Sequence, residues 1–155
     1  MITFQIESWQ QYFNDPQRLV LWQEHYEELE QAHSRQMPMA PDEAFYAALD
    51  SAGILVILTA RQDGILVGYC LAVIKRHPHY NAVCGFEDSY YLTPRARKGS
   101  IGYRLLKAMR DELTQRGCCR SYWMTKEFAS VEVLFQRLGM KKMDSVYCYS
   151  TWENS

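Results

Sequence analysis

The chain has 155 residues, of which 48% are hydrophobic and 14% aromatic, so it is long enough to bury a core and too apolar to be disordered. Its 17 lysines and arginines nearly balance its 18 acidic residues, whereas a general nucleic-acid binder usually carries a clear excess of positive charge. We therefore expect one folded domain, residues 1–155, and disfavour nucleic acid as its main partner.

The first third of the chain predicts one strand and two helices. Residues 2–8 alternate apolar and polar side chains, which is typical of a strand with one buried face. Asn14-Asp15-Pro16 then offers an N-cap and a proline at the first helical position, and apolar residues at helical spacing extend this helix to about residue 32. A loop at residues 37–41 precedes a shorter helix that we expect to end near Leu49.

The middle of the chain is rich in strand signals. Residues 54–60, 65–75 and 82–92 form three runs of mostly apolar, β-branched and aromatic side chains. A turn containing Asp63-Gly64, which is a strong hairpin signal, joins the first two runs, and a second turn lies at residues 77–81. These strands are expected to form an antiparallel meander.

The last third alternates element types. Apolar residues on one helical face predict an amphipathic helix over residues 100–116, and signals for a short strand, a short helix and a final strand follow at 121–125, 131–138 and 143–152. The resulting order is β-α-α-β-β-β-α-β-α-β. An antiparallel meander followed by such alternation predicts an α/β (α+β) fold with a central mixed sheet flanked by helices.

The junction Leu92–Gly102, with the sequence LTPRARKGSIG, lies between a predicted strand and a predicted helix. A helix N-terminus has unpaired amide groups and a partial positive charge, so it attracts anions, and glycines let a phosphate approach the backbone. Arg95, Arg97 and Lys98 add positive charge beside it. The residue order fits neither a P-loop nor the GxGxxG fingerprint. By itself the stretch is either an anion-binding loop or a charged turn.

Two segments carry a resemblance to a known family. Residues 97–102, RKGSIG, followed by Tyr-Arg-Leu-Leu, are similar to the pattern Gln/Arg-x-x-Gly-x-Gly/Ala, with Ser100 at the usual first glycine. Leu92-Thr93-Pro94 matches the lead into that loop, and residues 133–140, VLFQRLGM, resemble a later Leu-Tyr-Glu-Lys-Leu-Gly-Phe segment. With the element order, these segments resemble the GNAT acetyltransferase superfamily. The run from His77 to Gly99 also looks like acetyltransferases of bacteriophages and prophages.

The resemblance implies that acetyl-CoA binds in a V between two parallel strands, one ending at Leu92 and one around Tyr122. It places the pyrophosphate on the loop amides and the thioester carbonyl near Leu92, where a backbone N–H would stabilise the tetrahedral oxyanion. Gly99 is expected to supply the backbone freedom that Ser100 lacks. The residues expected to bind acetyl-CoA are Leu92, Thr93, Arg97, Lys98, Gly99, Ser100, Ile101 and Gly102.

Direct acyl transfer to an amine needs a base, and an acid near the departing thiolate also helps. Members of the family often carry a glutamate on the strand before the loop, where this chain has Glu87 and Asp88, with Glu87 nearer the usual spacing. Neighbours on a strand face opposite sides, and a bulge would exchange them. Phe135 stands where the family commonly has a tyrosine that protonates the thiolate, so we favour Tyr147 as its substitute. The other candidates for this role are Tyr90, Tyr122 and Tyr149.

The resemblance implies an N-acetyltransferase that transfers acetyl from acetyl-CoA to a primary amine, which is a small molecule, a protein lysine or an N-terminus. Ser100 and Phe135 also fit an alternative, a weakly active or inactive CoA-binding regulatory module. Acidic residues in the two N-terminal helices form either an ordinary solvated face or a wall that attracts a cationic amine. A homodimer is compatible with either function.

The cysteine pattern and the hydropathy of the chain indicate whether it binds a metal, where it resides and whether it spans a membrane. The five cysteines include no Cys-x-x-Cys pair, and His77, His79 and Cys84 lack further ligands at standard spacing, so we expect no metal. Reduced thiols and the absence of a signal-peptide pattern indicate a cytoplasmic protein. The longest apolar run, residues 53–58, is too short to span a membrane.

Overall fold

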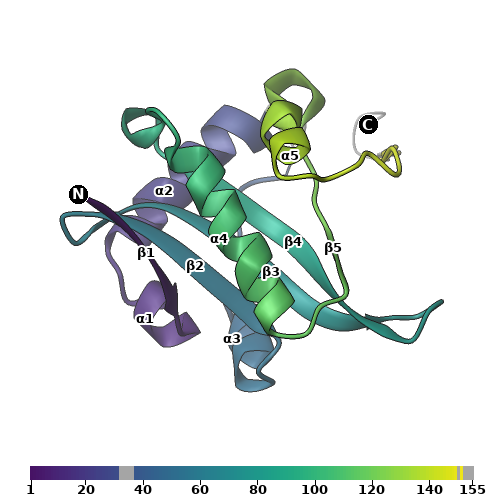
Figure 1. Ribbon diagram of the computed structural model, residues 1–155. Helices are drawn as coiled ribbons and strands as arrows, with labels where there is room; N and C mark the ends of the chain where they lie inside the picture. The colour runs from purple at the N-terminus through teal and green to yellow at the C-terminus, as the bar shows by residue number, and fades with distance from the viewer. Residues whose placement is uncertain (32–36, 150, 152–155) are drawn as a thin grey trace.

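The computed structural model describes residues 1–31, 37–149 and 151. Its strands form one five-stranded sheet in the order β1-β2-β3-β4-β5 (Figure 1). The pairs β1–β2, β2–β3 and β3–β4 are antiparallel, and the pair β4–β5 is parallel, so the predicted mixed sheet is confirmed. The strands are β1 (Ile2–Glu7), β2 (Leu55–Gln62), β3 (Ile65–His77), β4 (Ala82–Leu92) and β5 (Arg120–Tyr122).

Helices cover both faces of the sheet. In Figure 1, α4 crosses one face, and α1, α2 and α3 lie on the other. The α-helices are α1 (Trp9–Phe13), α2 (Gln17–His25), α3 (Glu43–Ser51), α4 (Ile101–Gln115) and α5 (Glu132–Arg137). The π-helix η1 (Tyr26–Glu30) continues α2, and two 3₁₀ turns are η2 (Pro94–Ala96) and η3 (Glu127–Ala129).

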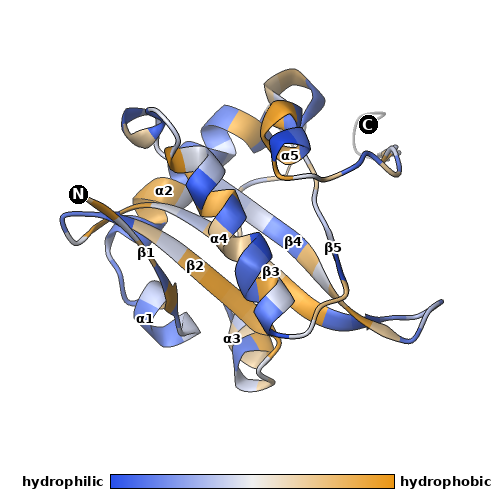
Figure 2. Cartoon of the chain, in the orientation of Figure 1, coloured by the Kyte–Doolittle hydropathy of each residue, from blue (hydrophilic) through white to orange (hydrophobic). Residues whose placement is uncertain are grey.

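A hydrophobic core packs against each face of the sheet, which explains why β2 and β3 are apolar almost throughout (Figure 2). On one face Cys70 and Ala72 of β3 pack in the core that includes Met109 of α4. On the other face Tyr69 and Leu71 belong to the core formed with α1 and α2. The alternation along β3 therefore separates residues that face α4 from residues that face the N-terminal helices.

Local signals account for several element boundaries. Asp63 and Gly64 have φ values of 51° and 84°, as a two-residue hairpin turn with positive φ at both positions requires. Helix α1 was not predicted from the sequence, and it begins with a capping box in which Ser8 and Gln11 bond each other's backbone N–H. At the predicted Asn14-Asp15-Pro16 signal, Asp15 accepts a hydrogen bond from Gln17 N–H, and α2 begins at Gln17, one residue after the proline.

The predicted final strand at residues 143–152 is wrong over the part that the structure describes. Residues 141–149 have no regular secondary structure, and residues 150 and 152 lie outside the described residues. The apolar side chains that suggested a strand are exposed, so their alternation covers no hydrophobic surface. The β5 edge beside which such a strand would pair is three residues long and offers few backbone groups.

Candidate active site

Strands β4 and β5 separate after a short paired stretch. Their parallel pairing covers residues 84–86 and 120–122, after which β5 ends and β4 continues to Leu92. Two β4 side chains bridge this V to the chain beyond β5. Glu87 Oε2 accepts a hydrogen bond from Met124 N–H at 3.0 Å, and the Tyr90 hydroxyl donates to the Met124 carbonyl at 3.0 Å. The two parallel strands thus diverge where the sequence predicts the V.

A β-bulge in β4 places the two candidate carboxylates, Glu87 and Asp88, in different surroundings. Leu71 pairs with Ser89 and Ala72 with Glu87, so Asp88 is the extra residue. Glu87 bonds across the V to Met124, whereas Asp88 accepts hydrogen bonds from Tyr46 of α3 and from Ser89. Glu87 therefore lies in the V, and Asp88 lies on the side of the N-terminal helices.

Burial makes Glu87 a suitable base near neutral pH. The residue is 7% exposed, and this desolvation raises the pKa of its carboxyl to about 7, against the lowering effect of the Met124 N–H. A carboxyl with this pKa is partly ionised at pH 7, as general-base catalysis requires.

The loop before α4 exposes a row of unpaired amides. Among the described residues, the N–H groups of Gly99, Ser100, Gly102 and Tyr103 have no hydrogen-bond acceptor. Gly99 has a φ of 57°, and Ser100 has a φ of −102°, which any residue adopts. The glycine thus takes the strained position, and serine fits where a glycine is usual. These N–H groups at the start of a 15-residue helix can bind an anion.

Arg97 holds this loop rather than facing the free amides. Its Nε donates to the Leu92 carbonyl at 2.6 Å, and its two terminal nitrogens form a bidentate pair with Glu28 of η1 at 2.5 and 2.7 Å. Glu28 also accepts a hydrogen bond from the Tyr91 hydroxyl at 3.0 Å. The π-helix therefore fastens the N-terminal helices to the loop.

Replacing Glu28 with glutamine tests this attachment. We expect the KM for acetyl-CoA to rise about 3- to 10-fold with kcat nearly retained, because the partly exposed pair positions the loop without touching the reacting atoms. Steady-state kinetics measures both parameters. Glu112→Gln removes a similar exposed pair with Arg116 near the other end of α4 and is the matched control. Equal effects of the two variants would contradict a positioning role for Glu28.

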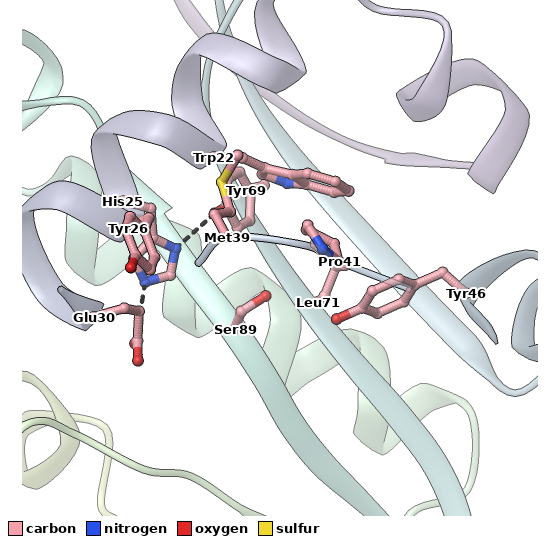
Figure 3. A pocket seen from close by; sticks show the side chains of 10 residues that line it. All are labelled: Trp22, His25, Tyr26, Glu30, Met39, Pro41, Tyr46, Tyr69, Leu71 and Ser89. Atoms are coloured by element: carbon pink, nitrogen blue, oxygen red, sulfur yellow. Dashed lines mark hydrogen bonds and ion pairs between the residues drawn. The ribbon is translucent and has the colours of Figure 1, made fainter. Parts of the chain in front are cut away.

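A pocket of about 150 Å³ lies beside the bulge, on the face of the sheet covered by the N-terminal helices (Figure 3). It is open at the surface, and its walls come from α2, η1, the loop before α3, α3 itself, β3 and β4. The lining residues are Trp22, His25, Tyr26, Glu30, Met39, Pro41, Tyr46, Tyr69, Leu71 and Ser89.

His25 is a titratable side chain in the wall of this pocket, and sequence reasoning missed it. Its Nδ1 lies 2.6 Å from the Tyr69 hydroxyl, its Nε2 lies 3.9 Å from Glu30 Oε1, and its ring stacks on Tyr91. Burial lowers the pKa of His25, so the ring is neutral at pH 7. Its only sequence signal was a position on the apolar face of α2, next to Trp22, and that position does not reveal which strand residues it meets.

The remaining predicted residues occupy different parts of the structure. Thr93 is buried, and its N–H donates to the Val67 carbonyl. Lys98 is exposed beside the free amides, and Ile101 packs against the α4 core. Tyr147 is 93% exposed in the irregular segment after α5, and nothing in the structure brings it to the V.

Tyr90 packs beside Phe135, the residue at the predicted acid position. Phe135 is buried, and its ring packs edge-on against Tyr90 with centroids 6.2 Å apart. Burial raises the pKa of Tyr90, so its hydroxyl stays protonated at pH 7. Tyr122 lies away from this contact, stacked on Phe86.

Two further features concern metals and membranes. No group of three or more histidine, cysteine or acidic side chains suited to a metal ion occurs within residues 1–31, 37–149 and 151. Over the same residues, no helix is both long enough and apolar enough to cross a membrane.

A model of the acetyltransferase (GNAT) family matches residues 9–140, which is most of the chain. The chain therefore belongs to the acetyltransferase (GNAT) family, whose members are N-acetyltransferases that use acetyl-CoA as co-substrate. None of the curated proteins compared with the chain matches it.

Solved structures share the fold at low sequence identity. An aminoglycoside acetyltransferase from an uncultured soil metagenomic sample, in complex with sisomicin, has 13% identity and a TM-score of 0.73, covering 97% of this chain and 95% of its own. A ribosomal-protein-alanine N-acetyltransferase from Brucella melitensis biovar Abortus 2308 has 17% identity and a TM-score of 0.68, covering 97% and 99%. A predicted acetyltransferase with acetyl-CoA from Clostridium acetobutylicum has 12% identity and a TM-score of 0.70, covering 99% and 98%.

Proposed function

We propose that the chain transfers the acetyl group of acetyl-CoA to a primary amine held in the pocket, by direct attack of the amine on the thioester. The observation that carries this proposal is the row of four free N–H groups at the start of α4, next to a V that adjoins the pocket.

The loop fits a pyrophosphate. Its free amides and the positive end of α4 favour negative charge, and a Cβ built on Gly99 would meet nothing within 4 Å, so space is open beside the backbone. Lys98 supplies a side-chain cation, while Arg97 holds the loop in shape. The pantetheine arm would then follow β4 into the V, with a backbone N–H near Leu92 stabilising the oxyanion.

Glu87 and Tyr90 would move the protons. The amine nitrogen bonds to the acetyl carbon to give a tetrahedral oxyanion, and Glu87 accepts the proton that the amine loses. The carbonyl then re-forms, the carbon–sulfur bond breaks, and Tyr90 donates a proton to the departing thiolate. Both side chains already reach the V, where they bond to Met124. Asp88 and Tyr147 are weaker candidates, because Asp88 is bonded to Tyr46 and Tyr147 points into solvent.

The inactive-module alternative rested on Ser100 and Phe135. Ser100 adopts an ordinary negative φ, and the Tyr90 ring packs on Phe135 while its hydroxyl reaches Met124, so both residues are compatible with catalysis. Incubation of the protein with acetyl-CoA and a panel of primary amines, with release of free CoA thiol as the readout, separates the two functions. Transfer to at least one amine is expected. Tight binding of acetyl-CoA without transfer to any amine would favour the inactive module.

Two further proposals concern the chain as a whole. We propose that residues 1–155 form one domain, because both hydrophobic layers share a single sheet. The five free cysteines support a reducing compartment such as the cytoplasm.

A further inference from the structure

The pocket that adjoins the V has a mouth and an interior of different character. Glu30 lies at one end, and its Oε2 accepts a hydrogen bond at 2.9 Å from Lys126, which belongs to the segment beyond β5 (Figure 3). This end therefore adjoins the V. An acceptor amine must reach the V to meet a thioester, so the part of the acceptor behind the amine is what fills the pocket.

The interior is apolar and fixed. Trp22, Tyr69 and Leu71 are 8%, 2% and 1% exposed, and Tyr46 at the other end stacks on Trp9 with ring centroids 5.2 Å apart. Side chains held this firmly form a preformed wall, which favours a flat or slender apolar group.

The polar groups of the pocket are already bonded within the protein. The hydroxyls of Tyr46 and Ser89 donate to Asp88, and the Tyr26 hydroxyl donates to the Met37 carbonyl. His25 Nδ1 is paired with the Tyr69 hydroxyl. An amino sugar enclosed here would leave hydroxyls without partners, which costs about 1–3 kcal/mol for each.

The charged groups at the pocket are few. Glu30 is the only charged side chain among the lining residues that the structure describes, and Lys126 pairs with one of its oxygens at 2.9 Å. Asp88 lies behind the wall, where it accepts hydrogen bonds from Tyr46 and Ser89. A positively charged amine can share the Glu30 carboxylate with Lys126, and the ring faces of the pocket also attract a cation. A phosphorylated acceptor would find no lysine or arginine among those lining residues.

The volume of the pocket limits the size of the acceptor. The pocket measures about 150 Å³. An apolar protein cavity of roughly 150 Å³ holds one benzene ring. We propose that the acceptor is a small arylalkyl primary amine, whose single ring fills the space between Trp22, Tyr46 and Leu71 and whose amine lies at Glu30. This inference rests on the proposed acetyl transfer and narrows its acceptor.

A comparison of acceptors tests the proposal on the unmodified protein. Initial rates are measured with acetyl-CoA and 2-phenylethylamine, glucosamine 6-phosphate, an aminoglycoside or a lysine-containing peptide. The expected kcat/KM for 2-phenylethylamine exceeds each of the others at least ~10-fold, as differential burial of one apolar group allows. A higher value for any of the other three acceptors would overturn the proposal.

A variant that fills the pocket provides a second test of the proposed acceptor site. Ser89→Phe places a ring in the proposed acceptor space, and we expect kcat/KM for 2-phenylethylamine to fall at least ~10-fold while the KM for acetyl-CoA stays within about 2-fold. Thr3→Phe adds the same bulk to the exposed edge strand β1 and is the matched control. Equal behaviour of the two variants would contradict the assignment of the pocket.

A binding measurement separates failure of this inference from failure of the proposed function. Calorimetry follows 2-phenylethylamine added to wild-type protein saturated with CoA. Binding that Ser89→Phe abolishes supports the pocket assignment even if no amine is acetylated, a result that would refute only the proposed transfer. Absence of binding, with acetyl transfer to other amines intact, refutes the arylalkylamine assignment alone.

Discussion

Glu87→Gln is expected to lower kcat about 10²- to 10⁴-fold with little change in acetyl-CoA affinity, because the variant keeps the hydrogen bond from Met124 N–H but cannot accept the amine proton. In the wild type, kcat/KM should rise with pH and level off above about 7, where the carboxyl is ionised. The variant should lose this rise. Steady-state kinetics between pH 5 and 9 measures both effects.

The same substitution changes stability in a direction opposite to its effect on activity. Burial raises the pKa of Glu87 from 4.5 to about 7, so between these pH values the folded protein binds more protons than the unfolded chain, and stability falls as pH rises. Glutamine does not titrate, so Glu87→Gln should be more stable relative to wild type at pH 8 than at pH 5, by at least about 1 kcal/mol. Glu112→Gln, at a half-buried position of α4, should show neither effect. Full activity of Glu87→Gln would remove this residue from the mechanism.

Gly102→Glu is expected to weaken acetyl-CoA binding at least ~100-fold, since it places a carboxylate among the free N–H groups that would hold the pyrophosphate. The substitution should leave the fold intact. A Cβ at this position would approach only Leu134 Cδ1, at 3.7 Å, and a negative charge in the first turn of a helix is favourable. Calorimetry with acetyl-CoA measures the affinity, and thermal unfolding checks the fold.

Gln115→Glu introduces the same charge at the exposed C-terminal end of the same helix and is the matched control. It should bind acetyl-CoA with nearly wild-type affinity. If Gly102→Glu also bound with wild-type affinity, the pyrophosphate would not lie at the start of α4.

Elements defined by local signals could be predicted from the sequence. The three central strands follow from apolar runs separated by turns, and β4 has the predicted bounds, Ala82–Leu92. The hairpin at Asp63-Gly64 and the helix after Ser100 also depend on neighbouring residues alone. Within the loop, the positive φ of Gly99 agrees with the expectation that it would take the conformation Ser100 avoids.

Features that depend on distant contacts could not be predicted. The bulge that separates Glu87 from Asp88 is an irregularity in the pairing of β3 with β4, and neither strand's sequence marks it. The pocket gathers side chains from α2, α3, β3 and β4, so no single segment indicates it. The predicted final strand was wrong because alternation of apolar residues does not guarantee a partner strand or a surface to cover.

The role of Arg97 could not be inferred from its position in the loop motif. The sequence placed this residue at the first position of the loop motif, among the acetyl-CoA-binding residues. Its guanidinium is engaged by Glu28 and the Leu92 carbonyl, so its proposed contribution is to hold the backbone that presents the amides. That partner lies in a π-helix 69 residues away in sequence and could not be inferred from the loop.

A crystal structure of the protein with acetyl-CoA would locate the cofactor relative to α4 and the V. We expect the pyrophosphate within hydrogen-bond distance of the N–H groups of Gly99, Ser100, Gly102 and Tyr103, and the thioester in the V next to Glu87 and Tyr90. A pyrophosphate bound away from the start of α4, or a thioester remote from the V, would contradict this expectation.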